Sequence, residues 1–193
     1  MKNPKMINNK TSALILFIGV SQFYIFLNIA AFLVPGYNLS NNSISHLGIV
    51  STGYIFNASI IILGITEILS GIGFQKYSRT LSIFLIIAGI GSAGVGVFNE
   101  HFGYIHLVFA LLAFLFGSIS SYSVFAKRRD VMSGIWAFLG SLSIFSLVLF
   151  MLTIMVSNSF DLGLGEGGIE RMILIPNIVW ALAFSGSMFY SEK

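Results

Sequence analysis

Long apolar runs occupy most of the polypeptide from Ala13 almost to Tyr190, and short polar segments separate them. Each run holds about 20 residues of continuous apolar character, the length that an α-helix needs to cross a bilayer. A membrane β-barrel would instead show alternating segments of about 10 residues. The pattern predicts an all-α polytopic membrane helix bundle with six transmembrane helices, at residues 13–34, 49–73, 80–98, 104–125, 131–157 and 169–190.

The first apolar run follows a polar tail, residues 1–12, which carries Lys2, Lys5 and Lys10. A secretory signal peptide has a similar beginning, but its apolar core is only about 7–15 residues long. No convincing small-residue cleavage site follows this run. We therefore expect a transmembrane helix here, and a single six-helix domain over residues 13–190.

The composition supports a membrane environment and excludes several kinds of chemistry. Of 193 residues, 56% are hydrophobic and 9% are charged, whereas soluble domains are about 25% charged. Cysteine is absent, which excludes disulfides and cysteine metal sites. The net charge of +3 does not indicate nucleic acid, because the bases lie in short loops beside membrane segments. We expect membrane lipids as partners, and no nucleic acid.

Lysine and arginine are distributed unevenly between the two sides of the six-helix arrangement. One side would carry Lys2, Lys5, Lys10, Lys76, Arg79, Lys127, Arg128, Arg129 and Lys193. The other side would carry only Arg171. Basic residues are enriched in cytoplasmic loops, so the pattern predicts cytoplasmic N and C termini in a multi-pass protein of the cell membrane.

The outer side collects most of the acidic residues and all three histidines. The predicted loops bring five polar residues to one membrane face, where we expect a ligand-binding pocket: His46, Glu100, His106, Glu170 and Arg171. Zinc is an alternative ligand, held by His46, His101 and His106 with one position left for water. The spacing is not diagnostic, since His101 and His106 are five residues apart. Interfacial histidines that bind loop carbonyls are the simpler interpretation.

Two features near the sixth helix have competing interpretations. Arg171 could hold a phosphate or carboxylate, but we favour an internal ion pair with Glu100, Asp161 or Glu166. Residues 163–168 fit the pattern G-x-G-x-x-G. A dinucleotide site is rejected, because no strand precedes the pattern and Glu166 would repel phosphate. We expect a flexible loop there.

Polar residues inside the predicted spans also need an explanation. Glu67 lies roughly 9–12 Å from the cytoplasmic end of its helix, where an unpaired carboxylate is costly. It is therefore expected to face the bundle interior, either coupled to protons or as a neutral acid bonded to a neighbouring helix. Asn57 is expected to bond another helix. Small residues at Ala88, Ser92 and Gly96 indicate close helix packing, within the bundle or between two copies.

Three segments carry a family resemblance: SISHLG at 43–48, NEHFGYIHLVFALLAF at 99–114 and GIERMILIPNIVWALAF at 168–184. Together they resemble a prokaryotic family of multi-pass membrane proteins known as domain of unknown function 998. The arrangement is more distantly similar to the eukaryotic Frag1/DRAM/Sfk1 group, although His46 stands where that group has an aspartate. The resemblance implies six helices and the polar outer face described above, and no established reaction.

These observations favour a small uncharacterised membrane protein, rather than an enzyme, that binds a lipid, another apolar ligand or a membrane partner at its outer pocket. A second copy of the chain is one such partner. The first alternative is a zinc-dependent lipid hydrolase with His46, His101 and His106 as ligands and Glu100 as base. The second is a proton-coupled transporter that uses Glu67. Apart from that zinc, no cofactor is expected.

Overall fold

The computed structural model describes residues 8–190, except the side chain of Asn158, and its regular structure is entirely helical. The six long helices are α1 Asn9–Leu33, α2 Gly53–Gly73, α3 Arg79–Val97, α4 Tyr104–Arg128, α5 Val131–Met155 and α6 Gly165–Tyr190. Short 3-10 helices join them: η1 Ser45–Gly48, η2 Phe74–Lys76, η3 Glu100–Phe102 and η4 Asn158–Asp161. All six long helices are long and apolar enough to cross a membrane. The prediction of an all-α bundle with six candidate spans is confirmed.

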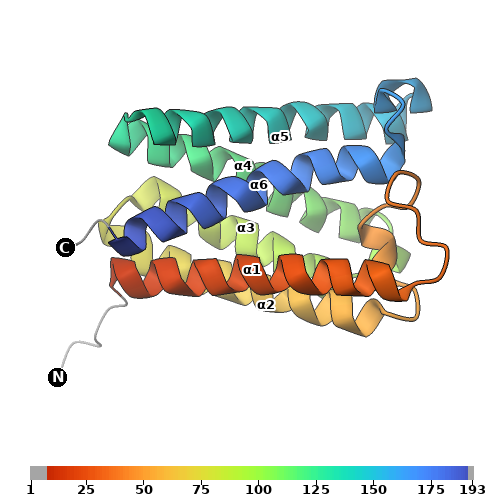
Figure 1. Ribbon diagram of the computed structural model, residues 1–193, viewed down its shortest axis with the longest axis horizontal. Coiled ribbons are helices and arrows are strands. Elements are labelled where there is room, and N and C mark those ends of the chain that lie inside the picture. The colour runs from red at the N-terminus through yellow and green to blue at the C-terminus, as the bar shows by residue number, and fades with distance from the viewer. Residues whose placement is uncertain (1–7, 191–193) are drawn as a thin grey trace.

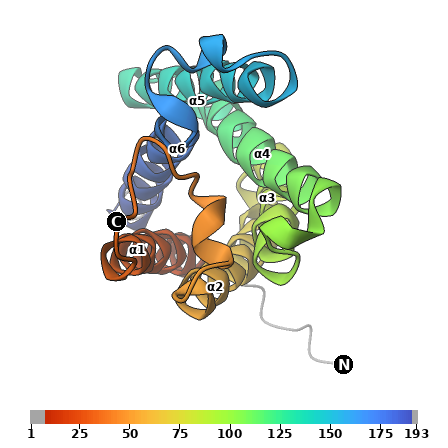
Figure 2. The same ribbon diagram turned by 90° about the vertical axis from the view of Figure 1, so that its right-hand side faces the viewer.

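The helices stand side by side in a ring, and each one packs against its neighbours in sequence. Contact between α6 and α1 closes the ring. Helix α1 begins and α6 ends at the same end of the bundle (Figure 1), here named the terminal end. The opposite end, named the loop end, carries the first loop, residues 34–52. Figure 2 views the molecule from this side, with the first loop across the ring.

Helix α1 begins at Asn9, earlier than the predicted start at residue 13, because the side chain of Asn8 caps it. Its Oδ1 accepts a hydrogen bond from the Thr11 amide at 2.7 Å. Asparagine is among the best N-cap residues because it satisfies a free amide of the first turn. The apolar pattern cannot show this extension, since residues 9–12 are mostly polar. Residues 1–7 and 191–193, with Lys2, Lys5 and Lys193, lie outside the described residues.

Helix α6 also begins early, at Gly165. The expectation of a flexible loop over residues 163–168 is therefore wrong from Gly165 onward. The hydroxyl of Ser40 donates to the Leu164 carbonyl, and the Gly168 amide donates to the Ser40 carbonyl at 3.1 Å. These bonds join the first turn of α6 to the first loop, which the local sequence does not indicate.

Small residues allow α2, α3 and α4 to pack closely. A β-carbon at Gly64 would lie 2.5 Å from both the Ala93 nitrogen and the Gly89 carbonyl oxygen. Backbone atoms cannot yield as a flexible side chain can, so this position of α2 requires glycine. The predicted stripe of Ala88, Ser92 and Gly96 is buried within the chain, which supports the interpretation as packing inside the bundle.

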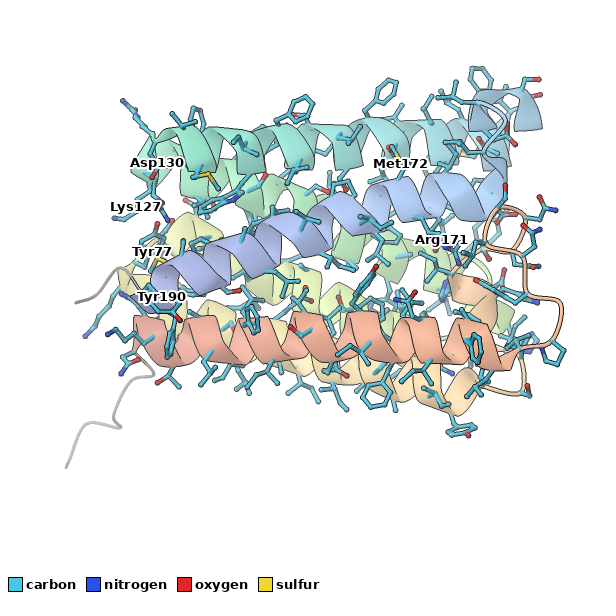
Figure 3. The ribbon with its side chains drawn as sticks, viewed as in Figure 1. Tyr77, Lys127, Asp130, Arg171, Met172 and Tyr190 are labelled. Carbon is cyan, nitrogen blue, oxygen red and sulfur yellow. The ribbon has the colours of Figure 1, made fainter. Side chains whose placement is uncertain are left out.

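Aromatic side chains fill the terminal end of the bundle. The ring of Phe184 packs against Phe74 and Trp136, with centroids 5.5 and 6.0 Å apart. The guanidinium of Arg128 lies 5.0 Å from the Trp136 ring, and the Lys127 ammonium lies 5.3 Å from the Tyr77 ring. Figure 3 shows Lys127 and Tyr77 at this end and Arg171 at the other. Cation–π contacts thus connect basic residues of the terminal end to this cluster.

Candidate functional site

The first loop brings its 3-10 helix η1 against the loop end of the bundle (Figure 2). Leu47 anchors η1, because its side chain is fully buried. Asn57 of α2 donates from Nδ2 to the Gly48 carbonyl at 2.9 Å. Asn57 thus bonds the short helix η1, and not a second long helix. A hydrogen bond to this loop carbonyl fixes the position of Ser45 and His46 above the ring.

Three side chains from different segments meet beneath η1 and form a hydrogen-bond network. His106 of α4 contacts the Phe98 carbonyl through Nδ1 at 2.8 Å and the Ser45 hydroxyl through Nε2 at 3.0 Å. The Ser45 hydroxyl lies 3.1 Å from Oε1 of Glu170, and Oε2 of Glu170 accepts from the Ile44 amide. His106 is 7% exposed and Glu170 is 2% exposed. We name this the His106–Ser45–Glu170 network.

The number of protons in this network follows from its donors and acceptors. A carbonyl oxygen only accepts, so Nδ1 of His106 carries a proton and donates to Phe98. Ser45 has a single proton, which serves either Nε2 of His106 or Oε1 of Glu170. With a neutral imidazole and an ionised carboxylate, one contact therefore lacks a proton. Both contacts are satisfied only when one more proton resides on Glu170 or on Nε2 of His106.

The predicted outer pocket is partly assembled around this network. His46 Nδ1 lies 3.4 Å from Oε2 of Glu100, and these side chains are 40% and 37% exposed. The structure thus brings His46, Glu100, His106 and Glu170 to the loop end. His101 lies exposed on η3. Among residues 8–190, no group of three or more His, Cys, Asp or Glu side chains is arranged to hold a metal ion.

Arg171 is placed at the same end but has a different role from the expected ion pair. Its guanidinium donates to the carbonyls of Leu39, Asn42 and Gly167 at 2.7, 3.2 and 2.8 Å. No acidic side chain within the described residues lies within ion-pair distance of it. The expected pair with Glu100, Asp161 or Glu166 is therefore wrong, because the folded first loop presents carbonyls that use the donors of Arg171.

Tyr37 completes the surroundings of Arg171. Its hydroxyl accepts from Nη2 of Arg171 at 3.0 Å and donates to the Ser43 carbonyl at 2.8 Å. Burial raises the pKa of Tyr37 above its usual value of 10.0, while the bond to Arg171 acts in the opposite direction. Arg171 and Tyr37 thus hold the first loop in the shape that positions Ser45.

Two cavities meet at the His106–Ser45–Glu170 network. The bundle cavity, about 80 Å³, lies inside the ring among apolar side chains. Its polar lining residues are Ser45, Glu67, Ser92, Glu170 and Asn177. The mouth cavity, about 200 Å³, lies between the loop-end halves of α4 and α5, and its polar lining residues are Ser43, Ser45, Glu100, His106, Glu166 and Glu170. Because Ser45, Ala110, Phe114 and Glu170 line both cavities, the two adjoin at the network.

Glu67 faces the bundle cavity, as expected for a carboxyl group within a candidate span. Its Oε2 accepts a hydrogen bond from Ser92 of α3 at 2.8 Å. Glu67 lies near the terminal end of α2, and Glu170 lies near the loop end of α6. The bundle cavity therefore has a carboxyl group toward each end.

Asn177 connects three helices beside the same cavity. Its Nδ2 donates to the hydroxyls of Ser118 in α4 and Ser143 in α5, at 3.0 and 2.8 Å. Its Oδ1 accepts from the indole Nε1 of Trp180 at 3.0 Å. These bonds hold α4, α5 and α6 together at the level of the bundle cavity.

Sequence reasoning did not select Ser45 and Tyr37 as site residues. Ser45 directly precedes His46 in the segment SISHLG, so the one available signal was its place in a polar loop beside a selected residue. Its contacts with His106 and Glu170 span 61 and 125 positions of sequence. Tyr37 and Arg171 are 134 positions apart. Only the folded first loop brings these partners together.

The fold and the site define a helical bundle with six candidate membrane spans and a buried polar network at one end. A family model described as protein of unknown function (DUF998) matches residues 17–186, and the chain belongs to this family. No curated protein and no solved structure was found to match the chain.

Proposed function

We propose that this protein binds a membrane lipid, or another amphiphile with one hydrocarbon chain and a polar end, inside the helical ring. The hydrocarbon part lies in the bundle cavity, and the polar end lies at the His106–Ser45–Glu170 network. The observation that carries this proposal is that an apolar cavity adjoins a polar mouth at Ser45 and Glu170. Burial of a hydrocarbon chain in the apolar cavity contributes about 0.8 kcal/mol per methylene.

The same proposal includes an orientation in the membrane. Basic residues described at the terminal end are Lys10, Lys76, Arg79, Lys127, Arg128 and Arg129. The loop end carries Arg171 alone among the described lysines and arginines. The preference of basic residues for the cytoplasmic side favours a terminal end in the cytoplasm. In that orientation the mouth cavity opens toward the extracytoplasmic side of the cell membrane.

Lipid analysis of the purified protein tests the binding. A β-carbon at Gly117 would meet no atom closer than 3.8 Å, and its nearest neighbour is Asn177 beside the bundle cavity. A Gly117→Leu side chain should occupy the space that the hydrocarbon chain needs. Gly186→Leu is the matched control, because a β-carbon at Gly186 has no neighbour within 4 Å.

Both variants and the unmodified protein are purified in mild detergent, and the co-purifying lipids are measured by mass spectrometry. The unmodified protein and Gly186→Leu should retain the same amphiphile in near-stoichiometric amount, and Gly117→Leu should lose most of it. Equal lipid content in all three proteins would contradict the proposal.

Proton-coupled transport is a second candidate, favoured by one observation. Glu67 and Glu170 line the same cavity, near opposite ends of the bundle. Two carboxyl groups on one cavity are typical of membrane proteins that move protons. Proteoliposomes with an internal pH-sensitive dye provide the test, with a pH difference across the membrane. Glu67→Gln should slow acidification relative to the unmodified protein. Unchanged rates would dismiss transport through Glu67.

A further inference from the structure

Ser45 and His106 have the arrangement of an activated nucleophile and its base. The Ser45 hydroxyl lies 3.0 Å from Nε2 of His106, within the distance for direct proton transfer. The bond from Nδ1 to the Phe98 carbonyl, at 2.8 Å, fixes the ring and leaves Nε2 facing Ser45. A third group that orients the base in this way is what nucleophilic sites require.

Ser45 lies where the polar end of the proposed amphiphile would lie. Ser45 lines both the bundle cavity and the mouth cavity, and His106 lines the mouth cavity. An amphiphile whose hydrocarbon chain enters the bundle cavity would place the first polar carbon after that chain beside the Ser45 hydroxyl. In a fatty acyl ester, this carbon is the ester carbonyl.

Glu170 supplies a hydrogen-bond donor for the ester carbonyl oxygen, which acyl transfer also needs. The proton count of the network allows a form in which Glu170 carries a proton and Ser45 donates to His106. In this form the carboxyl proton of Glu170 bonds the Ser45 oxygen, and it can turn to the ester carbonyl oxygen as negative charge develops there. A buried neutral carboxylic acid is an effective donor for such an oxygen.

We propose that Ser45, His106 and Glu170 cleave carboxylic esters of an aliphatic acyl group, an activity that rests on the binding proposed above. The Ser45 oxygen bonds to the acyl carbon while its proton moves to Nε2 of His106. The bond from the acyl carbon to the alcohol oxygen then breaks, and the alcohol leaves with the proton from His106.

Water from the mouth cavity completes the reaction. Its oxygen bonds to the acyl carbon, and one of its protons moves to Nε2 of His106. The bond to the Ser45 oxygen breaks, and Ser45 regains its proton from His106. The balance is one ester and one water converted to one carboxylic acid and one alcohol, with no change of oxidation state.

A fluorophosphonate with an alkyl chain tests the nucleophile, because it phosphonylates activated serines with loss of fluoride. The full-length protein in detergent is treated with this probe, and the modified residue is mapped by mass spectrometry. We expect an adduct at Ser45 in the unmodified protein and in the exposed Ser51→Ala control, and none at this position in Ser45→Ala. His106→Ala should slow labelling at least about 100-fold.

The proposal is overturned if no adduct forms at Ser45, or if His106→Ala is labelled as fast as the unmodified protein. Because the chain contains no cysteine, S45C and S51C each introduce a unique thiol. If His106→Ala does not fold, these two variants test whether His106 accepts the proton of the group at position 45. The alkylation rate of S45C should rise at a lower pH than that of S51C, since His106 accepts the thiol proton. An equal or higher pH midpoint for S45C would overturn the proposal.

The experiments distinguish a failure of the proposed esterase activity from a failure of lipid binding. A protein that retains its amphiphile but leaves Ser45 unlabelled keeps the binding function and loses the proposed esterase activity. The network would then serve only to hold the first loop against α4 and α6. A protein that is labelled at Ser45 but retains no amphiphile supports the nucleophile and contradicts stable lipid binding.

Discussion

Buried polar side chains at the loop end depend on a few hydrogen bonds, and Glu170 shows this most clearly. It is 2% exposed and accepts from the Ile44 amide and the Ser45 hydroxyl. Leaving a buried polar group without its partner costs about 1–3 kcal/mol. Glu170 therefore stabilises the first loop whatever else it does, and its substitution should be visible in stability as well as in function.

We predict that Glu170→Ala lowers the free energy of unfolding by about 1–3 kcal/mol, because the Ile44 amide loses its acceptor. Glu166→Ala, one helical turn earlier and exposed, should change it by less than about 0.5 kcal/mol. Unfolding of the two variants in detergent, followed by circular dichroism, gives the comparison. Equal effects of the two substitutions would show that the buried carboxyl group is not supporting the loop.

Tyr37 leads to a prediction for alkaline pH. Burial raises the pKa of Tyr37 above 10.0 in the folded protein, so the folded state holds the phenol proton more tightly than the unfolded state. Its contribution to stability is complete below pH 10 and is lost as pH rises through the raised pKa. Tyr37→Phe should therefore lose less stability than the unmodified protein between about pH 9 and pH 12. Identical alkaline losses would contradict a half-buried, neutral Tyr37.

The residues of the site could be predicted only in part. The positions of His46, Glu100, His106 and Glu170 beside predicted helix ends were sufficient to expect them on one face. Their partners were not predictable, since Ser45 and Arg171 bond to groups that the folded first loop presents. Arg171 in particular binds carbonyls, which every residue possesses and which a sequence pattern therefore cannot single out.

At the scale of helices, hydrogen bonds from Asn177 join α4, α5 and α6 where these helices surround the bundle cavity. In an apolar environment the hydrophobic effect contributes little to helix association, so packing and polar bonds matter more. Loss of the Asn177 amide also leaves the indole N–H of Trp180 without its acceptor, and Trp180 is 2% exposed.

We predict that Asn177→Leu reduces the free energy of unfolding by about 1–3 kcal/mol. Ser141→Ala is the matched control, because Ser141 bonds Tyr122 between α4 and α5 at an exposed position. This substitution should cost less than about 0.5 kcal/mol. A similar thermal shift for both variants in detergent would argue against a special role of the Asn177 bonds.

The number and type of the long helices could be predicted because each candidate span requires a long apolar run. Helix ends could not be predicted equally well, because they depend on polar contacts. Asn8 caps α1 through a local bond, and Ser40 holds the start of α6 from a distant loop. The apolar run predicts a second helix from residue 49, whereas α2 begins at Gly53 after η1.

At the scale of the whole molecule, an even number of spans brings both ends of the chain to one side. Asn38 and Asn41 each begin an N-x-S acceptor sequence for N-glycosylation, and both lie in the first loop, at the opposite end. In a glycosylating host, the loop end should acquire glycans, and Asn38→Gln with Asn41→Gln should remove them. Tags at both termini should be protected from protease in sealed cells. Termini detected on opposite sides would contradict the six-span topology.

The most direct measurement is a high-resolution map of the protein purified with its native lipids. We predict an elongated density in the bundle cavity, among the side chains of Phe23, Phe114 and Trp180. Its polar end should lie within hydrogen-bond distance of Ser45 or Glu170. A map in which the bundle cavity is empty or closed by side chains, with lipid only on the outer surface of the ring, would contradict binding inside the helical ring.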